Sequence, residues 1–198
     1  MKTEKTKKIK KKIQRALQRH GHLWKMFLMI TFIVVVGGLI FCKGLVVKSY
    51  KEKQYTSKEI NYQLFEKINR ITDGYPIQKM AAEISKQDEQ VAAFLVAIAK
   101  KESGWGKHTP KYKGKECYNY WGFRRKRLLM GSGGHTCFDS MEDAVRTVGE
   151  RIENLIAKGI DTPSEMVIWK CGNRCSYDPG AGKWIRDVQL YYQKIMDN

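Results

Sequence analysis

The chain has 198 residues, with 37 lysines and arginines against 20 aspartates and glutamates, which gives a formal net charge of +17. Hydrophobic residues make up 42% of the chain and charged residues 29%, so a disordered chain and a membrane protein with several spans are both excluded. This length favours one core domain of ordinary size with additional segments. The five cysteines are too few to replace a hydrophobic core.

The excess positive charge is concentrated at the N-terminus, where residues 1–25 hold ten lysines and arginines against a single glutamate. Residues 26–47 follow as an apolar run of 22 residues in which Lys43 is the only charged residue. A run of this length and hydropathy crosses a bilayer once. Because the denser positive charge precedes the run, we expect a cytoplasmic tail at 1–25 and export of the remaining chain. The expected location is the cell membrane, with the lipid bilayer contacted through residues 26–47.

Two other interpretations of the N-terminal region compete with a membrane anchor. A cleaved signal peptide is one, but the basic region is long and no small-x-small cleavage site follows the apolar run. An arm that binds nucleic acid is the other, because it also requires dense positive charge. The lysines here lack interleaved aromatic residues and stand before an apolar run, so no nucleic acid is expected as a partner.

Residues 48–75 predict a stalk helix and a linker. Thr56 and Glu59 have the spacing of a capping box, and the apolar residues after them recur at helical intervals. The sequence Thr-Asp-Gly-Tyr-Pro at residues 72–76 then ends the helix. The exported core domain is expected over residues 76–198, with Pro76 at the first position of a new helix.

This core domain is predicted to be mainly α-helical. Asp88 can cap a helix that runs from residue 89 to about Ser103. Over residues 104–140 the helical periodicity stops and seven glycines occur, which indicates a glycine-rich loop or small hairpin lobe. Further helices are expected after the lobe, beginning near Ser140, Thr162 and Ala181.

Glu102 departs from the apolar pattern of the helix predicted before the lobe. Val91, Leu95 and Ile98 are spaced so that their buried stripe continues into Glu102 at the last turn. A carboxylate in that position is costly unless it has a use, and general acid catalysis at a glycosidic oxygen is such a use. The alternative is a helix-end glutamate that forms an ion pair with a neighbouring lysine, namely Lys100, Lys101 or Lys107.

Glu102 also begins a motif. Residues 102–106 read Glu-Ser-Gly-Trp-Gly, which resembles the signature of bacterial glucosaminidases, the peptidoglycan hydrolases typified by the flagellar muramidase-like domain. Lytic transglycosylases share the Glu-Ser start. Further similarities follow in the order of the family and extend the resemblance over about residues 76 to 196; they lie at Asn119–Phe123, Phe138–Ala144 and Tyr177–Pro179.

The resemblance implies a lysozyme-like fold. It also implies a membrane-anchored glycosidase of the endo-β-N-acetylglucosaminidase type, which cleaves the glycan strands of peptidoglycan and uses no cofactor. In this family Glu102 would be the general acid and Tyr177 the tyrosine beside the catalytic site. The residues that the resemblance implies for substrate binding are Trp105, Asn119, Tyr120 and Trp121.

The second carboxylate of such an enzyme is not identified by a motif. Hydrolysis by two carboxylates requires a second Asp or Glu at about 5 to 9.5 Å from the first. Glu116 and Asp139, in or beside the predicted lobe, are the candidates for this catalytic role. A lytic transglycosylase needs no second carboxylate, because a hydroxyl of the substrate takes the place of water. A module that binds the cell wall without catalysis is a further alternative, in which Glu102 is structural.

Four of the five cysteines lie in the predicted exported part, where disulfides persist, and four cysteines allow three pairings. We expect the pairs Cys117–Cys137 and Cys171–Cys175, the first of which would close the lobe around Asn119. A zinc site of four thiolates is the alternative. Because Cys117 and Cys137 stand far apart in sequence and no histidine is placed to support them, no metal is expected.

The lobe also carries aromatic and basic side chains. Its aromatic residues either stack on sugars or fill a small core; they are Tyr112, Tyr118, Tyr120, Trp121 and Phe123. Residues 124–127 read Arg-Arg-Lys-Arg and are expected to be exposed, in position to meet an acidic cell-wall polymer.

Overall fold

The structure is a computed structural model that describes residues 29, 30, 32, 36 and 59–197. Residues 58–198 form one compact unit by themselves. Its helices are α2 (Tyr62–Ile71), α3 (Ala81–Ile84), α4 (Glu89–Ser103), α5 (Met141–Ile156), α6 (Ile168–Cys171) and α7 (Ala181–Met196). Short 3₁₀ turns lie at η1 (Pro76–Met80), η2 (Ser132–Gly134), η3 (Glu165–Val167) and η4 (Gly172–Tyr177). The predicted mainly α class is therefore confirmed for this unit.

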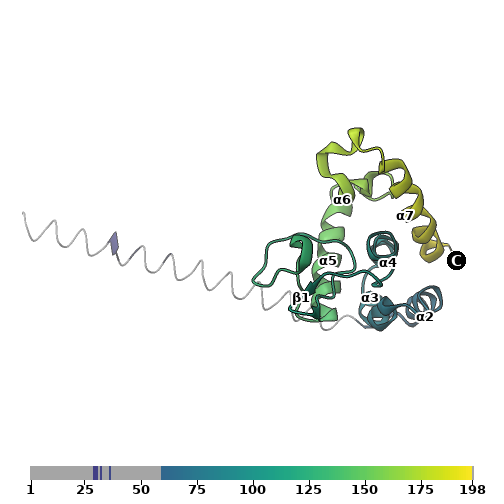
Figure 1. Cartoon of the computed structure of the whole chain (residues 1–198), viewed down its shortest axis with the longest axis horizontal. Coiled ribbons are helices and arrows are strands. Elements are labelled where there is room, and N and C mark those ends of the chain that lie inside the picture. The colour runs from purple at the N-terminus through teal and green to yellow at the C-terminus, as the bar shows by residue number, and fades with distance from the viewer. Residues whose placement is uncertain (1–28, 31, 33–35, 37–58, 198) are drawn as a thin grey trace, which may run out of the picture. The chain divides into compact units, whose positions relative to one another are not determined.

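Helix α4 is the centre of the fold and packs against both α5 and α7 (Figure 1). Every residue from Val91 to Ala99 is buried. A helix that is apolar on all sides is stable only when other elements cover it on all sides. The surrounding elements cover α4 on all sides as far as Ala99, and Glu102 in the last turn is exposed.

Helix α2 differs from the predicted stalk. It begins one turn later than expected, because Asn61 is its N-cap and accepts a hydrogen bond of 3.1 Å from the Leu64 amide. Thr56 of the expected capping box lies outside the described residues. Leu64 and Ile68 are buried in the same core as α4, against α3 and α7. The helix is thus part of the compact unit, and the boundary expected at residues 75 and 76 falls inside that unit.

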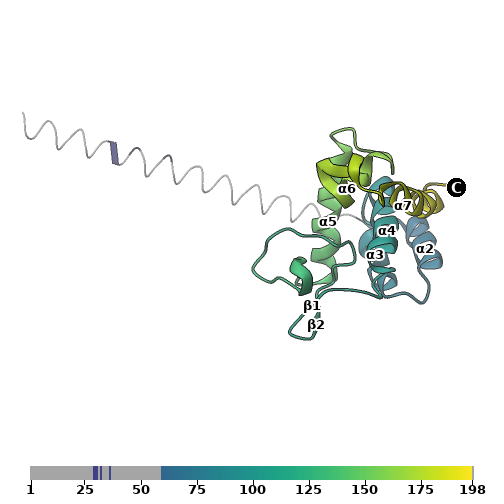
Figure 2. The ribbon, with the colours of Figure 1, turned by 45° about the horizontal axis from the view of Figure 1, so that its top comes forward.

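The glycine-rich lobe contains a short antiparallel hairpin, as expected. Strand β1 (Lys111–Tyr112) pairs with β2 (Lys115–Glu116). Figure 2 shows the lobe beside α5, on the side of the unit away from α2 and α7. The disulfides Cys117–Cys137 and Cys171–Cys175 are both formed, which confirms the predicted pairing and leaves no thiolate of these four for zinc.

Two of the predicted helix starts agree with the structure in detail. Ser140 caps α5 and accepts a hydrogen bond of 3.0 Å from the Asp143 amide. Helix α7 begins at Ala181. At α4 the expected cap is only partly present, because Asp88 occupies the N-cap position without a side-chain hydrogen bond to the helix.

The predicted membrane segment falls almost entirely outside the part of the chain that the structure describes. Of residues 26–47, only Met29, Ile30, Phe32 and Val36 are described, and these four are helical. Among the described residues, no helix is both long enough and apolar enough to cross a membrane. The tail at 1–25, the span and its orientation therefore stay predictions.

Candidate active site

The end of α4 is fixed by its own backbone. Gly104 has a left-handed conformation with φ of 59°, and its amide donates a hydrogen bond of 3.1 Å to the Lys100 carbonyl. The Trp105 amide donates to the Ala99 carbonyl at 3.1 Å. Such a pair of bonds ends a helix where glycine can take the left-handed conformation. Glu102 consequently lies on the final turn, where it is exposed.

The other residues of the Glu-Ser-Gly-Trp-Gly motif attach this helix end to the rest of the fold. Ser103 Oγ donates a hydrogen bond of 2.7 Å to the Tyr120 carbonyl and accepts one of 2.9 Å from the Gly106 amide. Trp105 Nε1 donates to the Val96 carbonyl at 2.8 Å. Gly106 lies so close to the Tyr120 ring that a Cβ would stand 2.8 Å from it. The motif therefore locks the position from which Glu102 projects.

The loop at residues 119–123 places a glycine against Glu102. Asn119 is buried and closes the loop, since its Nδ2 donates to the Phe123 carbonyl at 2.8 Å and its Oδ1 accepts from the Phe123 amide at 3.0 Å. Gly122 has φ of +66°, and a Cβ on it would lie 3.2 Å from Glu102 Oε2. The absence of a side chain at Gly122 thus leaves space beside this carboxylate oxygen.

Trp184 holds the other carboxylate oxygen. Its Nε1 donates a hydrogen bond of 2.7 Å to Glu102 Oε1, and its side chain is 1% exposed. The sequence predicts the helix that begins near Ala181 but does not single out Trp184 or this contact. A signal was present, because the indole N–H of a buried tryptophan requires an acceptor.

The similarity at Tyr177–Pro179 corresponds to the turn that begins α7. Asp178 forms an ion pair with Lys170 and accepts a hydrogen bond of 2.8 Å from the Gly180 amide. The Lys170 ammonium, together with this amide, lowers the pKa of Asp178. The turn fixes the start of the helix that carries Trp184, so it supports the site indirectly.

The three lysines near Glu102 all have other partners. Lys101 Nζ pairs with Asp187 Oδ2 at 2.6 Å, while Lys100 and Lys107 lie over aromatic rings. Within residues 59–197, no ion pair engages Glu102. The alternative in which Glu102 pairs with a lysine is therefore not supported. Glu102 is exposed although its carboxylate lies between Gly122 and the buried Trp184.

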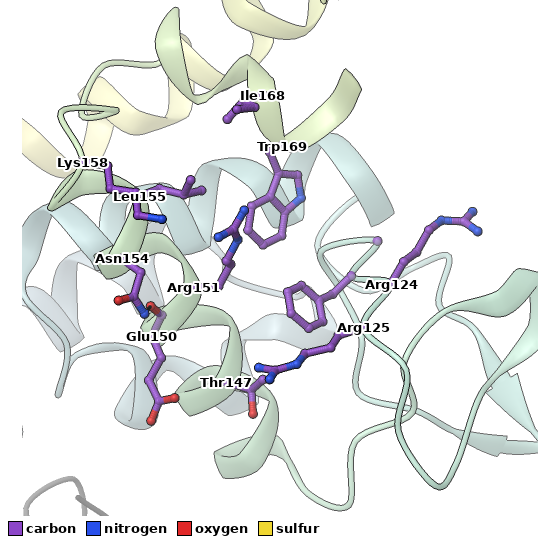
Figure 3. Close-up of a pocket in the computed structure, with 12 residues that line it drawn as sticks. Arg124, Arg125, Thr147, Glu150, Arg151, Asn154, Leu155, Lys158, Ile168 and Trp169 are labelled. Atoms are coloured by element: carbon purple, nitrogen blue, oxygen red, sulfur yellow. Dashed lines mark hydrogen bonds between the residues drawn. The ribbon is translucent and has the colours of Figure 1, made fainter. Parts of the chain in front are cut away.

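A pocket of about 650 Å³ extends from Gly122 across the lobe, α5 and α6 (Figure 3). Two aromatic side chains face it, those of Phe123 and Trp169, with ring centroids 5.9 Å apart. Trp169 Nε1 donates a hydrogen bond of 3.0 Å to the Trp121 carbonyl, which fixes its ring. The remaining lining residues are Arg124, Arg125, Thr147, Glu150, Arg151, Asn154, Leu155, Lys158 and Ile168.

The four residues expected to bind sugar are buried. Their exposed fractions are 3% or less, for Trp105, Asn119, Tyr120 and Trp121. Each polar group that they carry is directed at the protein itself; Trp121 Nε1, for example, donates to the Leu95 carbonyl at 2.8 Å. Burial raises the pKa of Tyr120, and the Glu116 carboxylate raises it further. These residues build the scaffold of the site, and Phe123 and Trp169 are the aromatic residues that line the pocket.

The other expected catalytic residues also lie at the surface, and neither they nor Glu102 line this pocket. Glu116 is exposed on β2, and Asp139 is exposed just before the cap of α5. Tyr177 is 89% exposed in η4. In the part of the chain that the structure describes, no hydrogen bond or ion pair joins any of the three to Glu102. The carboxylate that does line the pocket is Glu150, which stands 3.7 Å from Arg146.

The basic run at residues 124–127 divides into two parts. Arg124 and Arg125 are exposed and line the pocket, as expected for a surface patch. Arg127 is instead half-buried and forms an ion pair with Asp143, with a further hydrogen bond of 2.8 Å to Thr147. Burial opposes ionisation of Asp143, but the Arg127 guanidinium outweighs it and lowers the pKa of Asp143. Arg127 therefore ties the lobe to α5.

The chain matches no family model, no curated protein and no solved structure. In residues 59–197 and the four described residues before them, no cluster of three or more histidine, cysteine, aspartate or glutamate side chains is placed to hold a metal ion.

Proposed function

We propose that the unit at residues 58–198 is a lysozyme-like glycosidase that cleaves the glycan of peptidoglycan between N-acetylated sugars. The proposed type is an endo-β-N-acetylglucosaminidase with Glu102 as the general acid. One observation carries this proposal: the Glu102 carboxylate is exposed, has no ion-pair partner within residues 59–197, and is held between Trp184 and Gly122. Glu102 does not itself line the pocket, but Gly122 does, and so connects the carboxylate to Phe123 and Trp169.

The two carboxylate oxygens have different surroundings, which supports different roles for them. Oε1 accepts the hydrogen bond from Trp184 Nε1, whereas Oε2 faces Gly122. In the proposed mechanism the acidic proton is carried on Oε2 and passes to the glycosidic oxygen as the bond from that oxygen to the anomeric carbon breaks. Water then adds to the anomeric carbon and releases a proton to solvent. The missing side chain at Gly122 leaves room for the sugar, and Phe123 and Trp169 offer ring faces to neighbouring sugars.

One observation favours a second candidate, a lytic transglycosylase. Glu116 and Asp139 do not line the pocket, and the pocket-lining Glu150 lies beside the Arg146 guanidinium. A transglycosylase needs only the acid, because a hydroxyl of the substrate attacks the anomeric carbon instead of water. Both candidates share Glu102 and differ in the sugar end that they produce.

We further propose that residues 26–47 anchor this unit to the cell membrane, with residues 1–25 in the cytoplasm. The basic flank followed by a 22-residue apolar run supports this orientation. Protease added to intact spheroplasts is expected to remove the C-terminal unit and to spare an epitope placed at the N-terminus. Protection of the C-terminal unit would contradict the orientation.

The proposed activity is tested by digesting purified peptidoglycan with the full chain and identifying the new ends by mass spectrometry. New reducing ends on N-acetylglucosamine are expected. Anhydro-sugar ends would instead identify the transglycosylase. Binding without any released product would contradict both enzymes and leave a module that only binds the cell wall.

A further inference from the structure

The residues that line the pocket next to Gly122 carry more positive than negative charge. Four of its lining residues are basic, namely Arg124, Arg125, Arg151 and Lys158, and one is acidic, Glu150. This gives the lining a formal net charge of +3. Figure 3 shows the Arg151 side chain beside the Trp169 ring, with Lys158 on the side of Leu155. The positive charges thus line the same pocket as Phe123 and Trp169.

These four cations are not neutralised by the protein. In residues 59–197 none of them forms an ion pair, although Arg124 donates a hydrogen bond of 2.7 Å to the Gly133 carbonyl. Two other arginines nearby, Arg127 and Arg146, are both paired with Asp143. Asp143 thus neutralises the two arginines that hold α5 and the lobe, whereas the four pocket cations have no ion-pair partner within residues 59–197.

We propose that this pocket selects amino-sugar strands that carry carboxylates over neutral strands of the same sugars. This inference rests on the proposed function, since it names the substrate chemistry of the same site. Aromatic rings pack on sugar faces without regard to charge, whereas guanidinium groups bind carboxylates through paired hydrogen bonds. A strand of N-acetylglucosamine alone offers no carboxylate.

Carboxylates on a peptidoglycan strand come from two sources with the same chemistry. The lactyl group of muramic acid ends in a free carboxylate wherever its stem peptide has been removed. Where the stem peptide is present, that carboxylate is an amide, and the free carboxylates lie farther out on the peptide. The pocket groups recognise a carboxylate in either case, and the two sources can be separated by experiment.

The test measures binding by the full chain carrying Glu102→Gln, so that no strand is consumed. Four probes are compared: chitohexaose, amidase-treated strands with free lactyl carboxylates, the same strands after conversion of those carboxylates to amides, and strands with intact stem peptides. Binding to at least one carboxylate-bearing probe is expected to exceed binding to both neutral probes and to weaken with added salt. Preference for the amidase-treated strands assigns the lactyl group, and preference for the intact strands assigns the stem peptide.

Two matched double variants separate the pocket from general basicity. Arg151→Gln with Lys158→Gln removes two pocket charges, and Arg70→Gln with Lys79→Gln removes two exposed charges elsewhere. The basic residues 1–25 are the same in both. The pocket variant is expected to bind the carboxylate-bearing strand about fivefold more weakly, with unchanged binding of chitohexaose. The control variant is expected to bind both as before, and circular dichroism verifies that both variants are folded.

Equal affinity for the charged and neutral probes would overturn the inference, as would equal losses in the two double variants. Failure of the proposed catalysis gives a different result. In that case the chain without Glu102→Gln releases no product, while the charge preference and its dependence on Arg151 and Lys158 are unaffected.

Discussion

Trp184 and Glu102, which are 82 residues apart in the sequence, are joined by a hydrogen bond of 2.7 Å from the indole Nε1 to the carboxylate Oε1. The two residues lie on α7 and α4, the pair of helices that forms the main contact of the core. Trp184 is buried and Glu102 is exposed, so the bond connects the interior of the fold to a reactive group at its surface. Packing of the core thereby sets the orientation of the proposed acid.

Replacing Trp184 by phenylalanine tests this positioning role. The change keeps an aromatic ring in the core but removes the N–H that orients Glu102. We expect turnover of peptidoglycan to fall by about tenfold or more, because small displacements of a catalytic group are costly, with little change in KM. The free energy of unfolding should fall by about 2 kcal/mol from the smaller side chain.

Val188→Ala is the matched control for Trp184→Phe. Val188 is buried one turn later on the same helix. Its side chain has no polar atom and so forms no hydrogen bond to Glu102. This variant is expected to lose about 2 kcal/mol of unfolding free energy while turnover stays near that of the original chain. Equal turnover losses in the two variants would indicate that Trp184 acts through stability alone.

Gly122→Ala tests the space beside the other carboxylate oxygen. The new Cβ would stand 3.2 Å from Glu102 Oε2 in a backbone with φ of +66°. Gly159→Ala is the control, because φ there is +79° and a Cβ would meet nothing within 4 Å. Both variants should lose about 1 kcal/mol of stability from the left-handed conformation. Only Gly122→Ala is expected to lower turnover, by about tenfold, and an equal effect of Gly159→Ala on turnover would refute this.

Much of the fold was predictable because it depends on local patterns. The apolar run of α4, the cap at Ser140 and the start of α7 all follow from helical periodicity and capping residues, whereas the buried stripe expected to continue into Glu102 ends before this exposed residue. The disulfides followed from the distribution of the cysteines along the chain, with one pair closing the lobe and the other pair four residues apart. These features required no knowledge of which surfaces meet in space.

The contacts of the site were less predictable, because they depend on how a loop meets a helix end. Asn119 and Trp121 carry polar tips that suit either a sugar or the protein backbone, and only the packed structure shows that the backbone receives them. Arg127 stands in a run of basic residues, yet Asp143 of α5 removes it from the surface patch. Gly122 and Trp184 belong to the site only because they contact the two oxygens of the Glu102 carboxylate, which the sequence does not reveal.

The ion pair between Arg127 and Asp143 predicts a dependence of stability on pH. Because the pKa of Asp143 is below its usual value of 3.8 in the folded state, its contribution is present above that value and is lost as pH falls through the lowered pKa. Asp143→Asn should therefore reduce the free energy of unfolding by about 1 to 3 kcal/mol at pH 7. Urea unfolding at several pH values should show this difference shrinking toward acid pH, and a constant difference would contradict the assignment.

The most direct test of the account is the rate at which the full chain with Glu102→Gln releases fragments from purified peptidoglycan. The substitution keeps the shape of the side chain and removes the proton to be transferred, so turnover should fall by about 10² to 10⁴ while glycan binding and folding are preserved. Glu66→Gln, at an exposed position on α2, is the control and should retain full turnover. Release of fragments by Glu102→Gln at the rate of the original chain would contradict the central claim.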